Sequence, residues 1–297
     1  MGLGRPAVVS APGRARVRFL RKSGDRRGGV FNTVVVPAVD LNADLAEGED
    51  LSSTDLEILD SVTSASLACG FHAGNRDVMR ATAEAAVSRA VVIGAHVSYR
   101  DRDGFGRRAV AVRPAQLVED ILEQWAVLRE EVGAAGGTVT YVKPHGALYS
   151  RMGADPVVAA SVVEAVSRLG CPALVAQAGT VVAHLASQAG IRVVLEGFPD
   201  RGYLADGTLA ARDRPDALVE DPSATARRAV SLVKRGGIRA VDGTWVRVDV
   251  ETLCIHGDAP GAGETARRVR SALTAEAVDV RPFAPEAEGR PEDGRLP

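Results

Sequence analysis

The stretch TVTYVKPHGALY, residues 138–149, is the most informative segment for the fold. It opens with a short β-branched and aromatic run, Thr138 to Val142, which is typical of a buried strand. The run ends in Lys143 and His145, separated by a proline that cannot donate a ladder hydrogen bond. In open α/β sheets and in (β/α) barrels alike, ligands bind at the carboxyl ends of the strands. Lys143 and His145 therefore either lie on the surface with no role or form the bottom of a binding site, and the pattern of the other predicted strands distinguishes the two.

Short apolar runs alternate with helical segments about seven times along the chain. The runs are rich in Val and Ile, which indicates strands buried on both faces, as in a parallel sheet. The predicted strands are Val34 to Ala43, Ala65 to Phe71, Val91 to Ala95, Thr138 to Val142, Ala173 to Ala176, Arg192 to Leu195 and Trp245 to Ile255, the last long enough for two.

The clearest helix is Pro114 to Gly133, where apolar residues recur at steps of three and four. We expect further helices at Asn75 to Ala90, Asp155 to Leu169, Thr180 to Gly190, Asp221 to Lys234 and Ala259 to Ala277. Strand and helix in alternation predict a parallel α/β architecture, either a closed (β/α) barrel or an open doubly wound sheet. The Gly-x-Gly-x-x-Gly fingerprint is absent after the first strand, which disfavours the open nucleotide-binding sheet.

The composition excludes several classes of protein. The formal net charge is −2, so no global field attracts nucleic acid or an anionic membrane. No apolar stretch approaches the roughly 18 residues of a membrane span. The three cysteines are far apart, which argues against a disulfide framework and fits a reducing, cytoplasmic location.

The two ends differ from the rest of the chain. Residues 1–34 are strongly basic, and residues 283–297 are rich in Pro, Gly and Glu. Segments that bury little apolar surface do not offset their ordering entropy, so we expect disorder in both. For the basic segment, a tail that binds an acidic partner and an over-extended start codon are the alternatives. No Pro/Gly linker divides residues 35–282, which we interpret as one domain.

Polar residues gather where the predicted strands end. Four of the five histidines lie at such ends, with glycines beside them, so chance placement is a poor explanation. The exception, His184, lies inside a helical stretch and is interpreted as structural. The strand-end residues are Asp40, Asn42, Asp44, Glu47, His72, His96, Lys143, His145, Glu196, Asp200, Arg201, His256 and Asp258.

These residue types suit acid–base chemistry on an anionic substrate. Asp44 and Glu47 suit a general acid and a general base, if their surroundings separate their pKa values. Lys143 suits the stabilisation of an oxyanion or a phosphate. Arg107, after a glycine-rich loop, suits the recognition of a carboxylate or phosphate.

A metal site is the alternative use of the same strand ends. An Asp with two His is a plausible ligand set, and Asp44, His72 and His96 are the candidates. His145 and His256 also suit either proton transfer or metal binding. The chain lacks a His-x-x-x-His pair on a helix, and it lacks a Cys/His knuckle, so the presence of a metal is left open.

Six ordered blocks of sequence resemble the LamB/YcsF family, the family of the A subunits of prokaryotic 5-oxoprolinase. The resemblance runs from about Val39 to about Val280 and leaves out both ends. The blocks are VDLNADLAEG, TSASLACGFHAGN, IGAHVSYRDRDGFGRR, VKPHGALY, EGFPDRGY and LCIHGDAP. The resemblance implies an irregular seven-stranded parallel (β/α) barrel of the glycoside hydrolase/deacetylase type. It also implies ATP-dependent opening of 5-oxo-L-proline to L-glutamate, with Mg²⁺ expected beside ATP, in association with B and C subunits.

The convergence of the candidate residues on one predicted edge, taken with this resemblance, leads us to assign them roles. Catalysis is assigned to Asp44, Glu47, His72, Lys143 and His145, and substrate binding to Asn42, His96, Arg107, Asp200, Arg201, His256 and Asp258. The chain departs from the family pattern at three loops. Ala46 and Ser98 replace glycines, and Asn75 replaces an aspartate, which affects loop geometry and substrate identity more than fold.

Two other functions stay open. One is a metal-dependent amide or N-acetyl hydrolase, in which the metal activates a bound water. The other is a non-catalytic subunit that binds the lactam and delivers it to its partners. The sequence leaves open the identity of the general base, the activity of this chain alone, and whether it forms a homo-oligomer.

Overall fold

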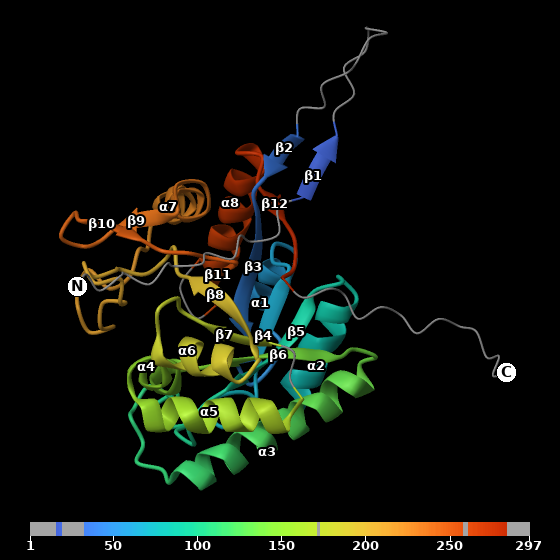
Figure 1. The fold of residues 1–297 in the computed structure, drawn as a ribbon. Coiled ribbons are helices and arrows are strands. Elements are labelled where there is room, and N and C mark those ends of the chain that lie inside the picture. The colour runs from blue at the N-terminus through green and yellow to red at the C-terminus, as the bar shows by residue number, and fades with distance from the viewer. Residues whose placement is uncertain (1–15, 20–32, 171–172, 258–260, 284–297) are drawn as a thin grey trace, which may run out of the picture.

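Seven parallel strands close into a barrel in the computed structural model, which describes residues 16–19, 33–170, 173–257 and 261–283 (Figure 1). The order around the ring is β3-β4-β5-β6-β7-β8-β11, and β11 pairs with β3 to complete it. The closed ring confirms the predicted (β/α) barrel and excludes the open sheet. Its strands are β3 (Ala38–Leu45), β4 (Ser64–Ala68), β5 (Val92–Val97), β6 (Val139–Pro144), β7 (Ala173–Ala176), β8 (Arg192–Gly197) and β11 (Thr252–His256).

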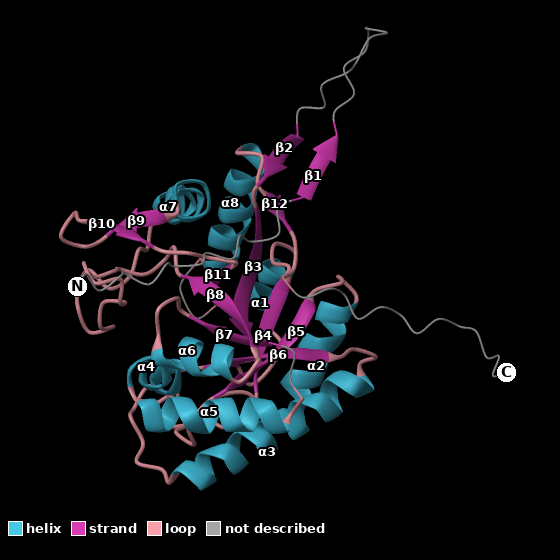
Figure 2. Ribbon diagram, in the orientation of Figure 1, coloured by secondary structure: helices cyan, strands magenta, loops and turns pink. Residues whose placement is uncertain are grey.

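Helices cover the outside of the ring, where Figure 2 shows them around the strands. They are α1 (Ser53–Leu59), α2 (Arg76–Val87), α3 (Pro114–Ala134), α4 (Gly146–Ala154), α5 (Pro156–Arg168), α6 (Val181–Gln188), α7 (Pro222–Arg235) and α8 (Ala262–Ala275). Six of these match the helices predicted from the sequence.

The predicted helix starts follow from local chemistry. The side chain of Asp155 accepts hydrogen bonds from the backbone N–H groups at the start of α5, and Asp221 does the same for α7. The helix α7 ends at Gly236, whose left-handed conformation carries little steric cost in glycine. Helices α1 and α4 were not predicted, because both are short and show little apolar periodicity.

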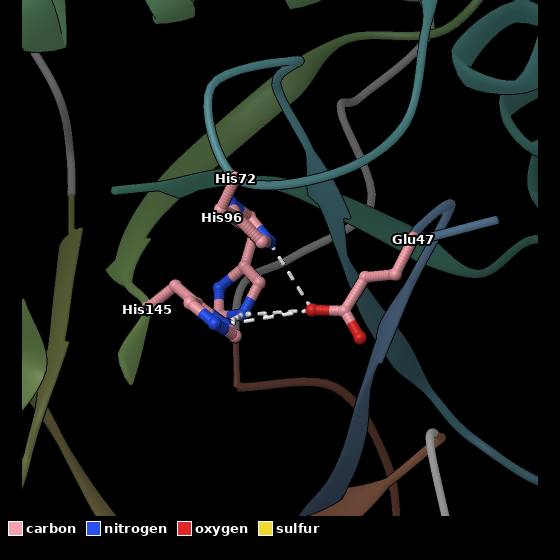
Figure 3. A group of neighbouring side chains, drawn as sticks. All are labelled: Glu47, His72, His96 and His145. Atoms are coloured by element: carbon pink, nitrogen blue, oxygen red, sulfur yellow. Dashed lines mark hydrogen bonds and ion pairs between the residues drawn. The ribbon is translucent and has the colours of Figure 1, made fainter. Parts of the chain in front are cut away.

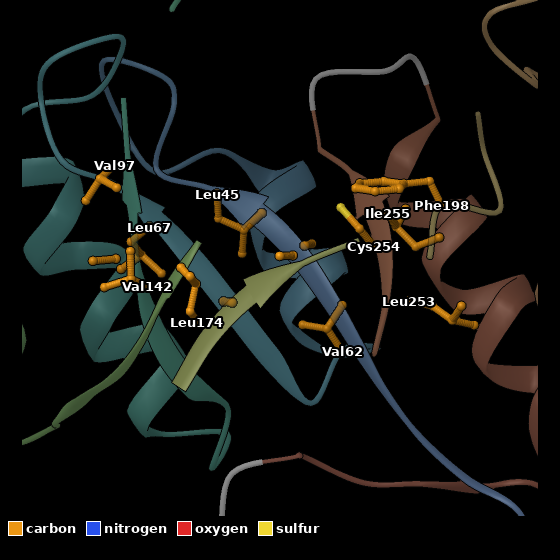
Figure 4. Packing of buried hydrophobic residues seen from close by; sticks show 14 of the residues in the cluster. Leu45, Val62, Leu67, Val97, Val142, Leu174, Phe198, Leu253, Cys254 and Ile255 are labelled. Atoms are coloured by element: carbon orange, nitrogen blue, oxygen red, sulfur yellow. The ribbon is translucent and has the colours of Figure 1, made fainter. Parts of the chain in front are cut away.

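The interior of the barrel is filled by side chains from every strand. All residues of β4 and of β5 are buried, as expected for strands covered on both faces. Figure 4 shows Leu45, Leu67 and Val142 packed with Leu174 and Leu253, which come from five different strands. Aromatic residues are few, so aliphatic side chains form most of this core.

Register within the ring decides which polar residues meet. Strand β11 lies beside β3 with Cys254 opposite Asn42 and His256 opposite Asp44. On the other side of the barrel, His96 of β5 lies opposite Lys143 of β6. Parallel strands in register bring their carboxyl ends to one edge, so these side chains share the mouth of the barrel.

The start of the described chain is an antiparallel pair, β1 (Arg16–Phe19) with β2 (Thr33–Val36). The sequence predicted one strand from Val34 to Ala43, and the structure divides it at Pro37 into β2 and β3. Most of the predicted basic extension and residues 284–297 lie outside the described residues, so their disorder stays a prediction. Two further short strands, β9 (Gly237–Arg239) and β10 (Trp245–Arg247), form an antiparallel pair, and β12 (Asp279–Val280) pairs in parallel with the start of β3.

Across the described part of the chain, none of the helices has the length and apolar character that crossing a membrane requires.

Candidate active site

A cavity of about 400 Å³ opens at the carboxyl edge of the barrel. This size lies at the lower end of the range for small-molecule sites. Its wall includes eight of the residues that the sequence assigned to the site: Asp44, Glu47, His96, Arg107, Lys143, His145, Arg201 and His256. The cavity therefore confirms that these side chains share one edge.

Lys143 is the centre of a buried polar network. Its ammonium donates hydrogen bonds to Asp44 Oδ1 at 2.7 Å and to Asn42 Oδ1 at 3.0 Å. It also forms an ion pair with Glu196 Oε1 at 2.9 Å, and Cys254 Sγ lies 3.0 Å away. Only 2% of the Lys143 side chain is exposed, so nearly all of its hydrogen-bonding capacity is used inside the barrel.

The charges in this network support one another. Burial alone would lower the pKa of Lys143, but Asp44, Cys254 and Glu196 raise it well above the usual value. Burial would likewise raise the pKa of Asp44, yet His96 and Lys143 hold it well below the usual value. An ammonium and a carboxylate are therefore held ionised at the cavity wall, although both are out of contact with bulk water.

Three histidines and a glutamate form a second group beside Lys143. Glu47 Oε1 lies 3.2 Å from His72 Nε2, 3.4 Å from His145 Nδ1 and 3.9 Å from His96 Nε2. His96 Nε2 and His145 Nδ1 are 2.9 Å apart, and the rings of His72 and His145 stack. Figure 3 shows the four side chains directed toward one another. We call this group the histidine cluster.

Two of these histidines are held in the neutral form. Burial, together with His145 and His96, lowers the pKa of His72 well below its usual value. Burial and His96 lower the pKa of His145 to about 3. The cluster therefore offers neutral imidazole nitrogens and a carboxylate, the donor set that borderline divalent metals prefer.

His256 and Asp200 form a separate dyad on the other side of the cavity. The Nδ1–H of His256 donates to Asp200 Oδ2 at 2.8 Å, and the backbone N–H of His256 donates to the same oxygen. Burial would raise the pKa of Asp200, but the charge and hydrogen bonds of His256 lower it. In the neutral imidazole with its proton on Nδ1, Nε2 of His256 carries the lone pair that a general base needs.

Four arginines also line the cavity: Arg107, Arg151, Arg201 and Arg212. Arg201 donates to the carbonyl oxygens of Ala217 and Ala210, which fixes its guanidinium. Burial and the neighbouring charge of Arg212 lower the pKa of Arg201. Such a concentration of positive charge favours an anionic ligand.

The remaining assigned residues lie behind the wall or outside the structure. His72 reaches the cavity only through Glu47 and His145, Asn42 through Lys143, and Asp200 through His256. Asp258 lies outside the described residues. Of the three predicted metal candidates, Asp44 is not part of the close group that holds His72 and His96, although its Oδ2 lies 3.3 Å from His96 Nε2.

Sequence reasoning gave no role to several residues that the site uses. Glu196 and Cys254 both contact Lys143, and Tyr149 lines the cavity beside them. The signal for Glu196 was present, because it stands at the end of a predicted strand with the other candidates. Cys254 lies within β11, where nothing in the sequence shows which face points into the barrel.

The three departures from the family pattern have visible consequences. Ala46 adopts a φ of 60°, a left-handed conformation that glycine would take more easily. The hydroxyl of Ser98 contacts His72 Nδ1 at 2.9 Å. Asn75 caps α2 by accepting from the N–H of Val78 at 2.9 Å, so it retains the capping function of an aspartate.

Comparison with known proteins gives consistent matches. The family model described as the LamB/YcsF family matches residues 39–288. The 5-oxoprolinase A subunit of Paracidovorax citrulli is 46% identical over 249 residues, which cover 83% of this chain and 99% of that protein. The 5-oxoprolinase A subunit of Streptomyces griseus is 47% identical and covers 83% of this chain and 100% of that protein. The crystal structure of the lactam utilization protein from Thermus thermophilus is similar at a TM-score of 0.78 and 42% identity, over 83% of this chain and 100% of that one.

Proposed function

This chain belongs to the LamB/YcsF family, and from that premise we propose that it is the A subunit of a 5-oxoprolinase. In this proposal it works as a hydrolase component in the cytoplasm, with B and C subunits, and opens 5-oxo-L-proline to L-glutamate. The observation that carries the proposal is the arginine-rich cavity, which holds a buried ion pair and a histidine–aspartate dyad at the mouth of the barrel. A small lactam with one carboxylate suits a cavity of this size and charge.

The chemistry explains the need for ATP. A five-membered lactam is a resonance-stabilised amide, and its carbonyl carbon is a poor electrophile. Transfer of the γ-phosphoryl group of ATP to the lactam oxygen releases ADP and provides a leaving group. Water then adds its oxygen to the carbon, the ring C–N bond breaks, and the nitrogen takes up a proton to become the amine. The resulting acyl phosphate reacts with a second water to give glutamate and inorganic phosphate.

The geometry suggests how the side chains divide this work. His256, oriented by Asp200, suits removal of a proton from the attacking water. Lys143 and Asp44 keep opposite charges fixed at the wall, where they suit stabilisation of the phosphorylated oxygen and of the departing nitrogen. Arg201 and Arg107 suit binding of the substrate carboxylate. ATP, with Mg²⁺, is the phosphoryl donor in this proposal, and the B and C subunits complete the enzyme.

The test is glutamate release from 5-oxoproline and ATP by the three subunits mixed together. We expect release only when all three are present, and a fall of at least about 100-fold with Asp44→Asn. Asp242→Asn is the matched control, because Asp242 is an exposed aspartate whose hydrogen bonds are local to its turn. Full activity in the Asp44→Asn complex would refute the assignment of the cavity.

The histidine cluster favours a second candidate, a metal-dependent amide hydrolase. That enzyme would release glutamate, or acetate from an N-acetyl substrate, without ATP and would lose activity with a chelator. A third candidate is a subunit that binds the lactam and does no chemistry. In that case Asp44→Asn would weaken lactam binding to the isolated chain and leave turnover at saturating substrate unchanged.

A further inference from the structure

The histidine cluster brings three imidazole nitrogens and one carboxylate oxygen together at the distances that metal ligands take. Glu47 follows β3, His72 follows β4, His96 lies in β5 and His145 follows β6, so four consecutive strands contribute one side chain each. Glu47 Oε1, His72 Nε2, His96 Nε2 and His145 Nδ1 lie within 4.8 Å of one another. Figure 3 shows the contacts of the three histidines converging on the oxygen of Glu47.

The outward nitrogens fix the tautomers of His96 and His145. Nδ1 of His96 lies 3.0 Å from the carbonyl oxygen of Lys143, and Nε2 of His145 lies 2.9 Å from the carbonyl oxygen of Phe105. A carbonyl oxygen only accepts, so each outward nitrogen carries a proton. In a neutral imidazole the other nitrogen then holds a lone pair. The two inward nitrogens lie 2.9 Å apart, and each carries a lone pair when its ring is neutral.

The tautomer of the third histidine, His72, is set by the hydroxyl of Ser98. The hydroxyl of Ser98 donates its proton to the carbonyl oxygen of Tyr99 at 2.9 Å. It therefore accepts from Nδ1 of His72, also at 2.9 Å. Nε2 of His72 is left with a lone pair, directed at a carboxylate oxygen of Glu47 at 3.2 Å. With all three rings neutral, three lone pairs and an anionic oxygen converge, and Asp44 Oδ2 lies beside them, 3.3 Å from His96 Nε2.

Imidazole lone pairs and a carboxylate that are directed at one another in a largely buried site are stabilised when a cation lies among them. A proton bridges two atoms, whereas here four converge. A tetrahedral ion at about 2.0–2.1 Å from its ligands separates those ligand atoms by about 3.3 Å. Four of the six separations are 2.9, 3.2, 3.4 and 3.9 Å and are distributed around that value. The outward partners Lys143 O, Phe105 O and Ser98 Oγ are of the kind that orient metal-binding imidazoles.

We propose that Glu47, His72, His96 and His145 bind one divalent transition-metal ion, of the class of Zn²⁺ or Co²⁺, in tetrahedral geometry. Glu47, His96 and His145 also line the cavity, so the bound ion faces a ligand in the cavity. This goes beyond the proposed lactam opening, since phosphorylation of the lactam oxygen by ATP does not call for an ion at this place. It also replaces Asp44, the carboxylate expected from the sequence, with Glu47.

The experiment measures binding of the metal alone, with no assay of activity. The full chain, purified without a histidine tag and freed of metal with a chelator, is titrated with Zn²⁺ by calorimetry and with Co²⁺ by visible absorption. We expect one equivalent of each ion, and the intense visible bands of tetrahedral Co²⁺. His145→Ala is expected to weaken binding by at least about 100-fold, a larger loss than removal of an outward partner causes.

Matched variants show which residues bind the ion and separate a loss of binding from a loss of folding. His184→Ala, on the exposed side of α6, is expected to bind like the unchanged protein. If His256→Ala abolishes binding and His145→Ala does not, the ion belongs to the group of Asp44, Cys254 and His256, and the proposal is overturned. If His145→Ala does not fold, Glu47→Gln decides, because it keeps the shape of a side chain at the cavity wall. Absence of stoichiometric binding, or unchanged binding in Glu47→Gln, overturns the proposal as well.

Discussion

The ammonium of Lys143 lies 2.7 Å from Oδ1 of Asp44, so a cation from β6 and a carboxylate from β3 meet inside the barrel. The two strands are not neighbours, since β4 and β5 lie between them in the ring. The contact therefore spans the interior of the barrel. A buried ion pair of this kind contributes to the position of charges at the site, whereas its net contribution to stability is small or unfavourable.

Removing the positive charge of Lys143 alone should lower the free energy of unfolding. Lys143→Met leaves the carboxylates of Asp44 and Glu196 buried without their partner, and we expect the free energy of unfolding to fall by about 3–5 kcal/mol. Lys234→Met is the matched control, because Lys234 pairs with Glu276 at the surface, where a loss below about 1 kcal/mol is expected. Urea denaturation of the three proteins measures both. Equal losses in the two variants would show that the buried network is not held by Lys143.

The dyad of His256 and Asp200 gives a prediction about kcat. Asp200→Asn keeps a side chain of the same shape beside His256 but removes the carboxylate that holds its Nδ1 proton and balances a charged imidazole. We expect kcat for glutamate release by the complete complex to fall about 10- to 100-fold, with the KM for the lactam changed much less.

The control for the dyad is Asp206→Asn, an exposed aspartate whose hydrogen bonds go to Thr208 in its own turn. It should leave kcat unchanged. If Asp200→Asn raises the KM and spares kcat, Asp200 and His256 bind the substrate, as the sequence suggested, and do not move its proton.

The location of most site residues could be predicted, because the carboxyl ends of parallel strands lie at one edge of the sheet. His72, His96 and His145 each follow or end a recognisable apolar run, so their meeting required only the correct assignment of the strands. The same reasoning placed Asp44 and Lys143 at the mouth. It missed the helix that begins at Gly146, because that segment looked like a turn and shows little periodicity.

The pairing of those side chains could not be predicted. Lys143 pairs with Asp44 while Glu47 joins the histidines, and the order of the strands alone does not show which carboxylate does which. The closure of β11 onto β3 brings Glu196 of β8 and Cys254 of β11 to Lys143. Neighbouring residues on a strand point to opposite faces, so an error of one residue in register would reverse every one of these assignments.

Asp40 provides a prediction about pH. Its carboxyl is buried, and burial raises its pKa to about 6, although the hydroxyls of Thr252, Thr63 and Ser64 oppose the shift. In the unfolded chain the same group ionises near its ordinary value of 3.8. Between these two values the unfolded state loses the proton and the folded state retains it. The contribution of Asp40 to the free energy of unfolding therefore falls as pH rises from about 4 to about 6, and reaches a cost of about 3 kcal/mol above that window.

The measurement compares Asp40→Asn with the unchanged protein by urea unfolding from pH 4 to pH 8. Relative to the unchanged protein, the variant should gain stability as pH rises through the window, and the difference should be constant above it. Asp242→Asn is the control, because the backbone and side chain of Thr244 lower the pKa of Asp242 below 3.8, so its stability difference changes only below pH 4 and should be constant from pH 4 to pH 8. A difference for Asp40→Asn that does not vary with pH would show that this carboxyl ionises alike in both states.

At Gly94 in β5, the backbone lies very close to a large buried side chain. A methyl group at this position would overlap three carbons of the Tyr141 ring, which is fully buried and whose hydroxyl is 3.2 Å from that of Ser66. The ring has no free space to move into, because it belongs to the second hydrophobic cluster with Val92 and Val175. We expect Gly94→Ala to lower the free energy of unfolding by at least about 1–3 kcal/mol.

Gly133→Ala is the matched control, since Gly133 lies in α3 and a methyl group there meets no atom within 4 Å. It should raise the free energy of unfolding by about 0.5–1 kcal/mol, because alanine is the better helix former. The variant Tyr141→Leu tests the cause. If the clash with the ring is responsible, Gly94→Ala costs much less in a Tyr141→Leu background than in the unchanged chain. Equal costs in both backgrounds would place the strain elsewhere in β5, because independent sites add and sites in contact do not.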